Sequence, residues 1–124
     1  MKKVLLHTVI FFLFASCQES LPPATKYAAR VSGTPGTAFT GNSTAFKKTD
    51  TSRIFQDFQG NIPIDGAFMI TFEEKIKGIE VLVQKTGSTG LLQLEVFINE
   101  RKVDSASTSD PHGSLFLKVG KTEP

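Results

Sequence analysis

The stretch GIEVLVQKTGSTGLLQLEVFINERKVDSAS, residues 78–107, decides the fold class. It holds two runs in which every second residue is apolar, separated by the turn-forming residues TGSTG at 86–90. Such strict alternation indicates half-buried β-strands. The pattern predicts two antiparallel strands joined as a hairpin, each with one face toward a core. The alternating residues are Ile79, Val81, Val83, Leu92, Leu94, Val96 and Ile98.

The residues that follow continue the strand pattern to the end of the chain. NERK at 99–102 is polar and short enough to reverse the chain, and small and β-branched residues follow at 103–107. SDPHG at 109–113 supplies the residues of another turn. SLFLKV at 114–119 alternates again and predicts the last strand.

Upstream of residue 78 the strand pattern is weaker but still present. YAARVSGT at 27–34 and FMITF at 68–72 alternate, and TAFTGNS at 37–43 is consistent with a strand that contains a glycine. Residues 52–59 are ambiguous, because their apolar residues also fit the spacing of a helix. We favour a strand there and keep the short helix as an alternative.

Together these segments predict an all-β fold: a single immunoglobulin-like β-sandwich of about seven strands over residues 27–119. Short strands at intervals of about 8 to 12 residues, with turn residues between them, are typical of that class. Residues 120–124 are left as a C-terminal tail.

The N-terminal segment has the features of a secretory signal. Two lysines at positions 2 and 3 precede an apolar run over residues 4–15. A membrane-spanning helix needs about 20 apolar residues, so a retained transmembrane anchor is the weaker alternative. We therefore assign residues 1–16 to a signal peptide.

Cys17 is the only cysteine of the chain, which excludes a disulfide within it. FASC at 14–17 resembles the lipobox of bacterial lipoproteins, although Phe14 stands where leucine is commonest. The resemblance implies cleavage before Cys17 and a diacylglyceryl group on its thiol, and acylation of the new amino group would add another chain. Two acyl chains suffice for stable attachment. An incidental cysteine is the alternative.

Lipid attachment at Cys17 places the protein in the cell envelope, bound to a membrane. Residues 17–26 would then be a tether, with paired prolines that stiffen it. Gln18 is not the aspartate associated with inner-membrane retention in enteric bacteria, which favours the outer membrane.

The charge balance argues against an anionic partner held by net charge. The full chain has 14 Lys and Arg against 12 Asp and Glu, and removing Lys2 and Lys3 with the signal leaves 12 against 12. Nucleic-acid binding calls for a clear basic excess, so no nucleic-acid partner is expected.

No pattern in the sequence indicates catalysis, a metal or a cofactor. After residue 16 the only histidine is His112, in a polar turn beside Asp110, with no further ligand close by. Glu73 and Glu74 lie in a mixed-charge stretch typical of a solvated loop. We therefore predict no catalytic residue, no metal site and no cofactor.

Three stretches of the chain resemble the mycobacterial small membrane protein (MmpS) family. They are YAARVSGTPGTAFTGNST at 27–44, Ile62–Pro63, and GLLQLEVFINERKVDSASTSDPHGSLFLKV at 90–119. The resemblance implies a small β-sandwich outside the inner membrane and, in that family, an accessory role beside RND-type lipid or drug transporters.

Two features depart from that family. Relatives often carry a cysteine on each of two late strands, where this chain has Leu94 and either Leu117 or Val119. They are also commonly held by a transmembrane helix, whereas lipid at Cys17 would hold this chain. The departures put the transporter role in doubt more than the fold.

Phe97 and Phe116 are the candidate residues for a partner surface, because the alternation places both on the outward side of their strands. The expected function is a lipid-anchored binding or accessory module without catalytic activity, with an envelope protein as partner. The alternatives are a small periplasmic enzyme or enzyme inhibitor, and a structural or adhesive surface protein. A loop covering both strands, or a strand register opposite to the expected one, would remove both phenylalanines from the surface.

Overall fold

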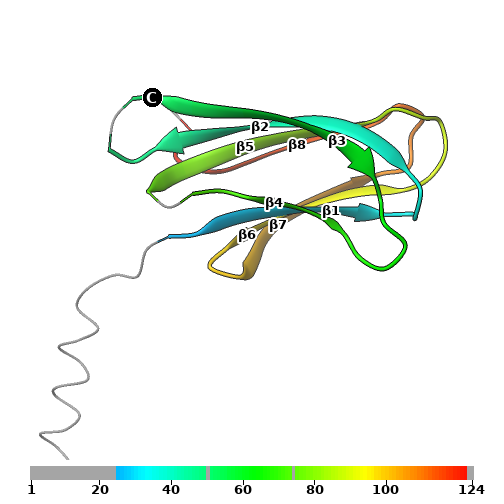
Figure 1. The fold of residues 1–124 in the computed structure, drawn as a ribbon, viewed down its shortest axis with the longest axis horizontal. Helices are drawn as coiled ribbons and strands as arrows, with labels where there is room; N and C mark the ends of the chain where they lie inside the picture. The colour runs from blue at the N-terminus through cyan, green and yellow to red at the C-terminus, as the bar shows by residue number, and fades with distance from the viewer. Residues whose placement is uncertain (1–24, 50, 74, 123–124) are drawn as a thin grey trace, which may run out of the picture.

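The computed structural model describes residues 25–49, 51–73 and 75–122, and these form two β-sheets packed face to face (Figure 1). One sheet has the order β4-β1-β6-β7, with β4 Phe68–Thr71, β1 Tyr27–Gly33, β6 Leu92–Ile98 and β7 Arg101–Thr108. The other has the order β3-β2-β5-β8, with β3 Arg53–Asn61, β2 Ala38–Lys47, β5 Ile76–Lys85 and β8 Ser114–Gly120. All strand pairs are antiparallel. The all-β sandwich is confirmed, with eight strands where about seven were expected.

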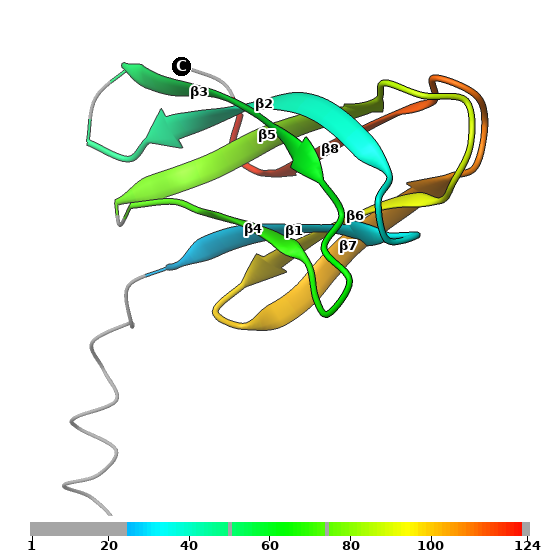
Figure 2. The same ribbon diagram turned by 45° about the vertical axis from the view of Figure 1, so that its right-hand side comes forward.

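The expected signal peptide over residues 1–16, Cys17 and most of the expected tether at 17–26 lie outside the described residues. Within them, Tyr27 opens β1 at one end of the sandwich, as both views of the ribbon show (Figures 1 and 2). The last strand ends at Gly120, one residue beyond the predicted domain boundary.

The apolar alternation places the core as predicted. The inward residues of β5 and β6 are fully buried apart from the partly buried Ile98, and they meet inward residues of β1, β2 and β8 between the two sheets. A trio of phenylalanines closes one part of this core. Phe39 is edge-on to Phe58 and Phe68, with ring centroids 6.4 and 5.3 Å away.

The predicted hairpin across residues 86–90 is wrong. β5 pairs with β2 and β8, whereas β6 pairs with β1 and β7, so this connection crosses from one sheet to the other. Alternation determines which side of a strand is buried but not which strand lies beside it. The crossing is held by Lys85, which is 1% exposed and donates from Nζ to the Gly90 carbonyl oxygen at 2.5 Å.

Two other turns form hairpins. Residues 53–61 are a strand, β3, paired along its length with β2, which resolves the ambiguity at 52–59 against the helix. β6 and β7 are joined through Asn99 and Glu100, whose φ angles are 50° and 69°. Two consecutive positive φ values are the geometry of the tight type I′ turn. NERK therefore reverses the chain as predicted.

The immunoglobulin-like assignment remains a prediction. The β2–β5 and β6–β7 pairings follow the strand order of the constant-type immunoglobulin fold. In that fold, however, the third strand lies in the sheet opposite the second, whereas here β3 pairs with β2.

Candidate functional site

Phe97 and Phe116 both point outward, as the alternation predicted, but from opposite sides of the molecule. Phe97 belongs to the β4-β1-β6-β7 sheet and Phe116 to the β3-β2-β5-β8 sheet. Phe116 is 52% exposed, whereas Phe97 is half-buried, with the Arg30 guanidinium 5.5 Å from its ring centroid. The two residues therefore cannot form one partner surface.

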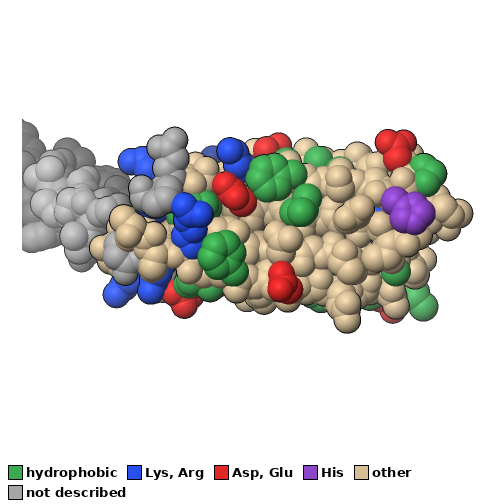
Figure 3. Space-filling model, turned by 90° about the horizontal axis from the view of Figure 1, so that it is seen from above, with side chains coloured by type: hydrophobic (Ala, Val, Ile, Leu, Met, Phe, Trp, Pro, Cys, Tyr) green, Lys and Arg blue, Asp and Glu red, His purple; other side chains and the backbone are tan. Residues whose placement is uncertain are grey.

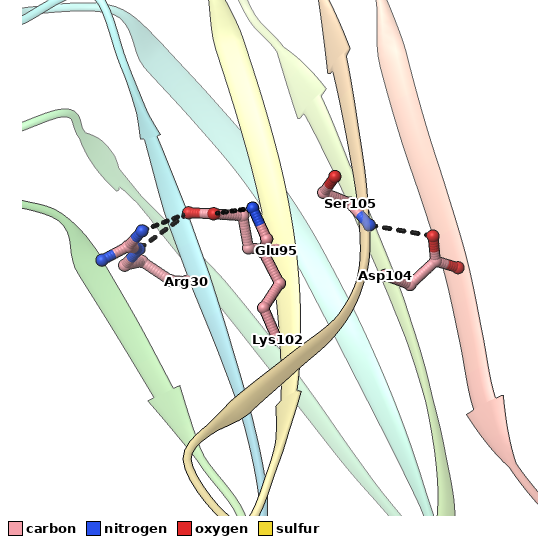
Figure 4. Close-up of polar contacts among 5 residues, drawn as sticks. All are labelled: Arg30, Glu95, Lys102, Asp104 and Ser105. Carbon is pink, nitrogen blue, oxygen red and sulfur yellow. Dashed lines mark hydrogen bonds and ion pairs between the residues drawn. The ribbon is translucent and has the colours of Figure 1, made fainter.

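A charged cluster occupies the outer face of the β4-β1-β6-β7 sheet (Figure 4). Arg30 donates from Nε and Nη2 to Oε1 of Glu95, at 2.8 and 2.6 Å, and Lys102 Nζ lies 3.5 Å from Oε2. These contacts join β1, β6 and β7 across the face. They leave the Glu95 side chain only 6% exposed although it points outward. The same arginine covers Phe97, which removes much of that ring from the solvent.

Replacing Glu95 with alanine should lower the free energy of unfolding by about 1–2 kcal/mol, because hydrogen bonds to charged groups contribute at about that level. It would leave Arg30 and Lys102 without this carboxylate. Gln93→Ala, on the same face of β6, is the matched control and should cost about 0.5 kcal/mol or less. Urea unfolding of both variants measures the difference, and equal costs would contradict the role of the cluster.

The outer face of the β3-β2-β5-β8 sheet carries the most exposed aromatic side chains, and we call it the aromatic face. Phe55 on β3 is 71% exposed and Phe116 lies on the other edge strand. Leu82 pairs with Phe116 between them and is half-buried. Seen from this side, separate apolar side chains stand on the face, with acidic and basic side chains of both signs beside them (Figure 3). A shallow hollow of about 330 Å³ beside Leu82 is lined by amide and hydroxyl side chains together with one carboxylate and apolar groups.

Sequence reasoning missed Phe55. The ambiguity between strand and helix over residues 52–59 concealed the direction of its side chain. Once β3 pairs with β2, Phe55 lies opposite Thr44 on the outward side, while its neighbours Ile54 and Phe58 pack against the core. A confident strand assignment would have placed it on the surface by alternation alone.

The basic and acidic side chains are unevenly distributed over the structure, although their total numbers are equal after residue 16. β1 begins at the same end at which β2 and β8 finish, and Tyr27 Oη donates to the Lys77 carbonyl oxygen there, linking the two sheets. We call this the basic end. Nine of the twelve Lys and Arg between residues 25 and 122 lie at it: Lys26, Lys47, Lys48, Arg53, Lys75, Lys77, Arg101, Lys102 and Lys121. Of the described acidic residues, Glu73 and Glu100 join them, and Glu95 pairs with Lys102.

The blue side chains gather at this end, on the left of the space-filling view (Figure 3). A hollow of about 500 Å³ opens there, lined by Thr25, Tyr27, Ile76 and Gly120 together with Lys48, Lys77 and Lys121. Tyr27 is almost fully buried at its base, and burial raises the pKa of its hydroxyl above the ordinary 10.0.

Because the pKa of Tyr27 is raised in the folded state, the free energy of unfolding should fall at high pH as this hydroxyl ionises. The folded state favours the neutral phenol, so its contribution is complete below pH 10 and is lost as the pH rises through the raised folded pKa. Tyr27→Phe should cost about 1 kcal/mol near neutrality, through the lost hydrogen bond to Lys77. The difference in free energy of unfolding between the wild type and Tyr27→Phe should become smaller above pH 10.

Because Tyr27 is the only tyrosine of the chain, its ultraviolet titration follows this group alone. The native protein should titrate above pH 10 and the denatured protein near it. Identical curves in the two states would overturn this prediction.

The titratable residues that the sequence analysis considered, His112 and Glu73, lie far from each other in the fold. His112 is exposed in the connection between β7 and β8, with a φ of 55°, and Glu73 is exposed between β4 and β5. Over residues 25–49, 51–73 and 75–122, no three His, Cys, Asp or Glu side chains gather as metal ligands would. In the same part of the chain, no helix has the length and apolar character to span a membrane.

No protein-family model matches this sequence, and no curated protein is significantly similar to it.

Proposed function

We propose that this protein is a lipid-anchored binding module of the bacterial cell envelope, which acts by presenting the aromatic face to a membrane-located protein partner and performs no chemistry itself. The observation that carries the proposal is the exposure of Phe55 and Phe116 on a single outer face. Exposed apolar groups gathered on one face are typical of interaction sites.

The size of the face supports a weak contact. Four strands about 4.8 Å apart, with a common length of about 25 Å, cover roughly 500 Å² on one partner. An interface of that size belongs to the small, transient class. Lipid at Cys17 would offset the weakness, because confinement to the same membrane raises the effective concentration of the two proteins.

The composition of the face indicates the chemistry of the partner. Asp57 lies on the β3 side, and Glu80 is paired in register with Lys118, so the face has little net charge. A complementary surface would be apolar at the positions of Phe55 and Phe116 and neutral polar between them. An envelope transporter, as in the family that the sequence resembles, is our proposal for the finer identity of the partner.

Site-directed photo-cross-linking in the native envelope tests the proposal. A photoreactive phenylalanine analogue at position 116, and separately at 55, should give the same adduct with a second protein. Met69 is the matched control position, because it is also exposed but lies on the outer face of the other sheet. Phe116→Ser should abolish the adduct formed from position 55. Adducts from position 69 alone would contradict the proposal.

An adhesive role is the second candidate, and one observation favours it. β3 is a nine-residue strand that pairs on one side with β2, and in the described structure no strand pairs with its other edge. It contains no lysine or proline, the residues that commonly protect a sheet edge. An adduct of position 55 with a second copy of this chain would favour this role.

A further inference from the structure

We propose that the hollow lined by Lys48, Lys77 and Lys121 binds phosphate groups of anionic lipids in the membrane that holds the chain, and thereby orients the sandwich. The inference rests on the proposed lipid anchor, because the anchor determines which surface the basic end meets.

The three lysines come from different strand ends, and their main chains are fixed. The amide of Lys48 donates to the Lys75 carbonyl oxygen at 2.8 Å, and the amide of Lys121 donates to the Lys77 carbonyl oxygen at 2.9 Å. Tyr27 Oη donates to the same Lys77 oxygen at 3.0 Å. The hollow is therefore built on two sheets and two close crossings of the main chain rather than on a single flexible loop.

Among the described residues, those that line the hollow include no carboxylate. Within the described parts of the chain, the ion pairs involve only Glu95, with Arg30 and Lys102, and Glu95 lies outside this hollow. The volume of about 500 Å³ exceeds what one phosphate group occupies, and it opens to the solvent side of the basic end. Three of the seven lining residues are lysines, whose cationic side chains favour anionic groups such as the singly charged phosphodiesters of anionic lipids.

The surrounding charge extends the attraction beyond the hollow. Nine basic residues lie at this end, against Glu73, Glu100 and the Glu95 carboxylate that pairs with Lys102. Asp50, Glu74 and Glu123 adjoin it in the sequence, and counting them still leaves a basic excess. A local excess attracts an anionic surface within about one Debye length even when the whole domain is neutral.

The length of the chain keeps this end near the membrane. Thr25 lines the hollow and is eight residues from Cys17. Eight residues span at most about 28 Å when fully extended. A lipid on Cys17 would thus hold the basic end toward the headgroups, with the aromatic face roughly perpendicular to the membrane and open to a neighbouring protein.

Vesicle binding by the full chain carrying Cys17→Ser tests the inference without the lipid. Sedimentation should show stronger binding to phosphatidylcholine mixed with phosphatidylglycerol than to phosphatidylcholine alone, and high salt should remove the difference. Adding Lys48→Gln, Lys77→Gln and Lys121→Gln should weaken binding to the anionic vesicles roughly 100-fold, at about tenfold or less per lysine.

A charge-matched control separates the hollow from net charge. Ser88→Asp, Thr89→Asp and Ser109→Asp make the same change in net charge in exposed connections at the opposite end. This variant should bind anionic vesicles nearly as well as its parent. Residues 1–24 are the same in every protein compared, so they contribute equally to each. Equal losses in the two triple variants would overturn the proposal.

Inorganic phosphate distinguishes a lipid site from a site for the free ion. Amide resonances of Lys48, Lys77 and Lys121 should shift with anionic vesicles at lipid phosphate concentrations at which inorganic phosphate has little effect. The reverse result would overturn the lipid assignment. Lipidation of Cys17 is measured separately, by the mass of the wild type, so failure of the anchor and failure of the hollow give different results.

Discussion

Replacing Cys17 with serine should transfer the protein from the detergent phase to the aqueous phase when it is expressed in a bacterial envelope. The wild type should lose residues 1–16 and gain the mass of acyl chains, since the thiol of Cys17 is the only one available for the lipid. Each buried methylene contributes about 0.8 kcal/mol to membrane attachment, so the loss of two chains removes stable anchoring altogether.

Intact mass and detergent partitioning measure the two effects together. Ser20→Ala, three residues beyond Cys17, is a control that should leave both unchanged. If wild type and Cys17→Ser are cleaved alike and both stay in the aqueous phase, the cysteine is incidental. A freely diffusing periplasmic or secreted binder would then be the better account.

Replacing Phe39 with alanine should lower the free energy of unfolding by about 3–5 kcal/mol, the usual cost of a phenylalanine removed from a core. Phe39 is 1% exposed and is edge-on to both Phe58 and Phe68, which stack on each other with centroids 5.7 Å apart. The surrounding strands cannot collapse into the space without breaking the β2–β3 pairing. The total free energy of unfolding of a domain of this size is about 5–15 kcal/mol, so this substitution would remove much of it.

Urea unfolding followed by circular dichroism measures this change. Phe55→Ala is the matched control, because Phe55 lies in the same sheet but is mostly exposed, and its cost should stay within about 0.5 kcal/mol. The cost of Phe39→Leu should lie between those of Phe39→Ala and Phe55→Ala, since leucine retains part of the buried volume. A loss below about 1 kcal/mol for Phe39→Ala would contradict the packing of this trio.

The proposed anchor, the basic end and the aromatic face would together form one consistent arrangement. Lipid and lysines would hold the same end of the sandwich at the membrane, while Phe55 and Phe116 lie on a side of it. Because the basic end and the aromatic face are separate surfaces and Cys17 belongs to neither, each can be changed by substitution independently of the others.

The site was only partly predictable from the sequence. Alternation placed Phe97 and Phe116 outward correctly, but the two residues lie on opposite sheets. Arg30, distant in sequence from Phe97, covers that ring. The equal numbers of basic and acidic residues, 12 each, gave no sign of the basic end. A net charge does not tell where in the folded structure the charged residues lie.

The sequence by itself determined the fold class and the buried side of the strands that alternate clearly, because side-chain alternation is a local property with a period of two. Only the tertiary structure decided that β5 and β6 belong to different sheets, since strand pairing depends on contacts between residues distant in the chain. The strand pairing then determined how the surface residues are distributed. It gathered nine basic side chains at the end where β1 begins, and it put Phe55 and Phe116 on one face and Phe97 on the other.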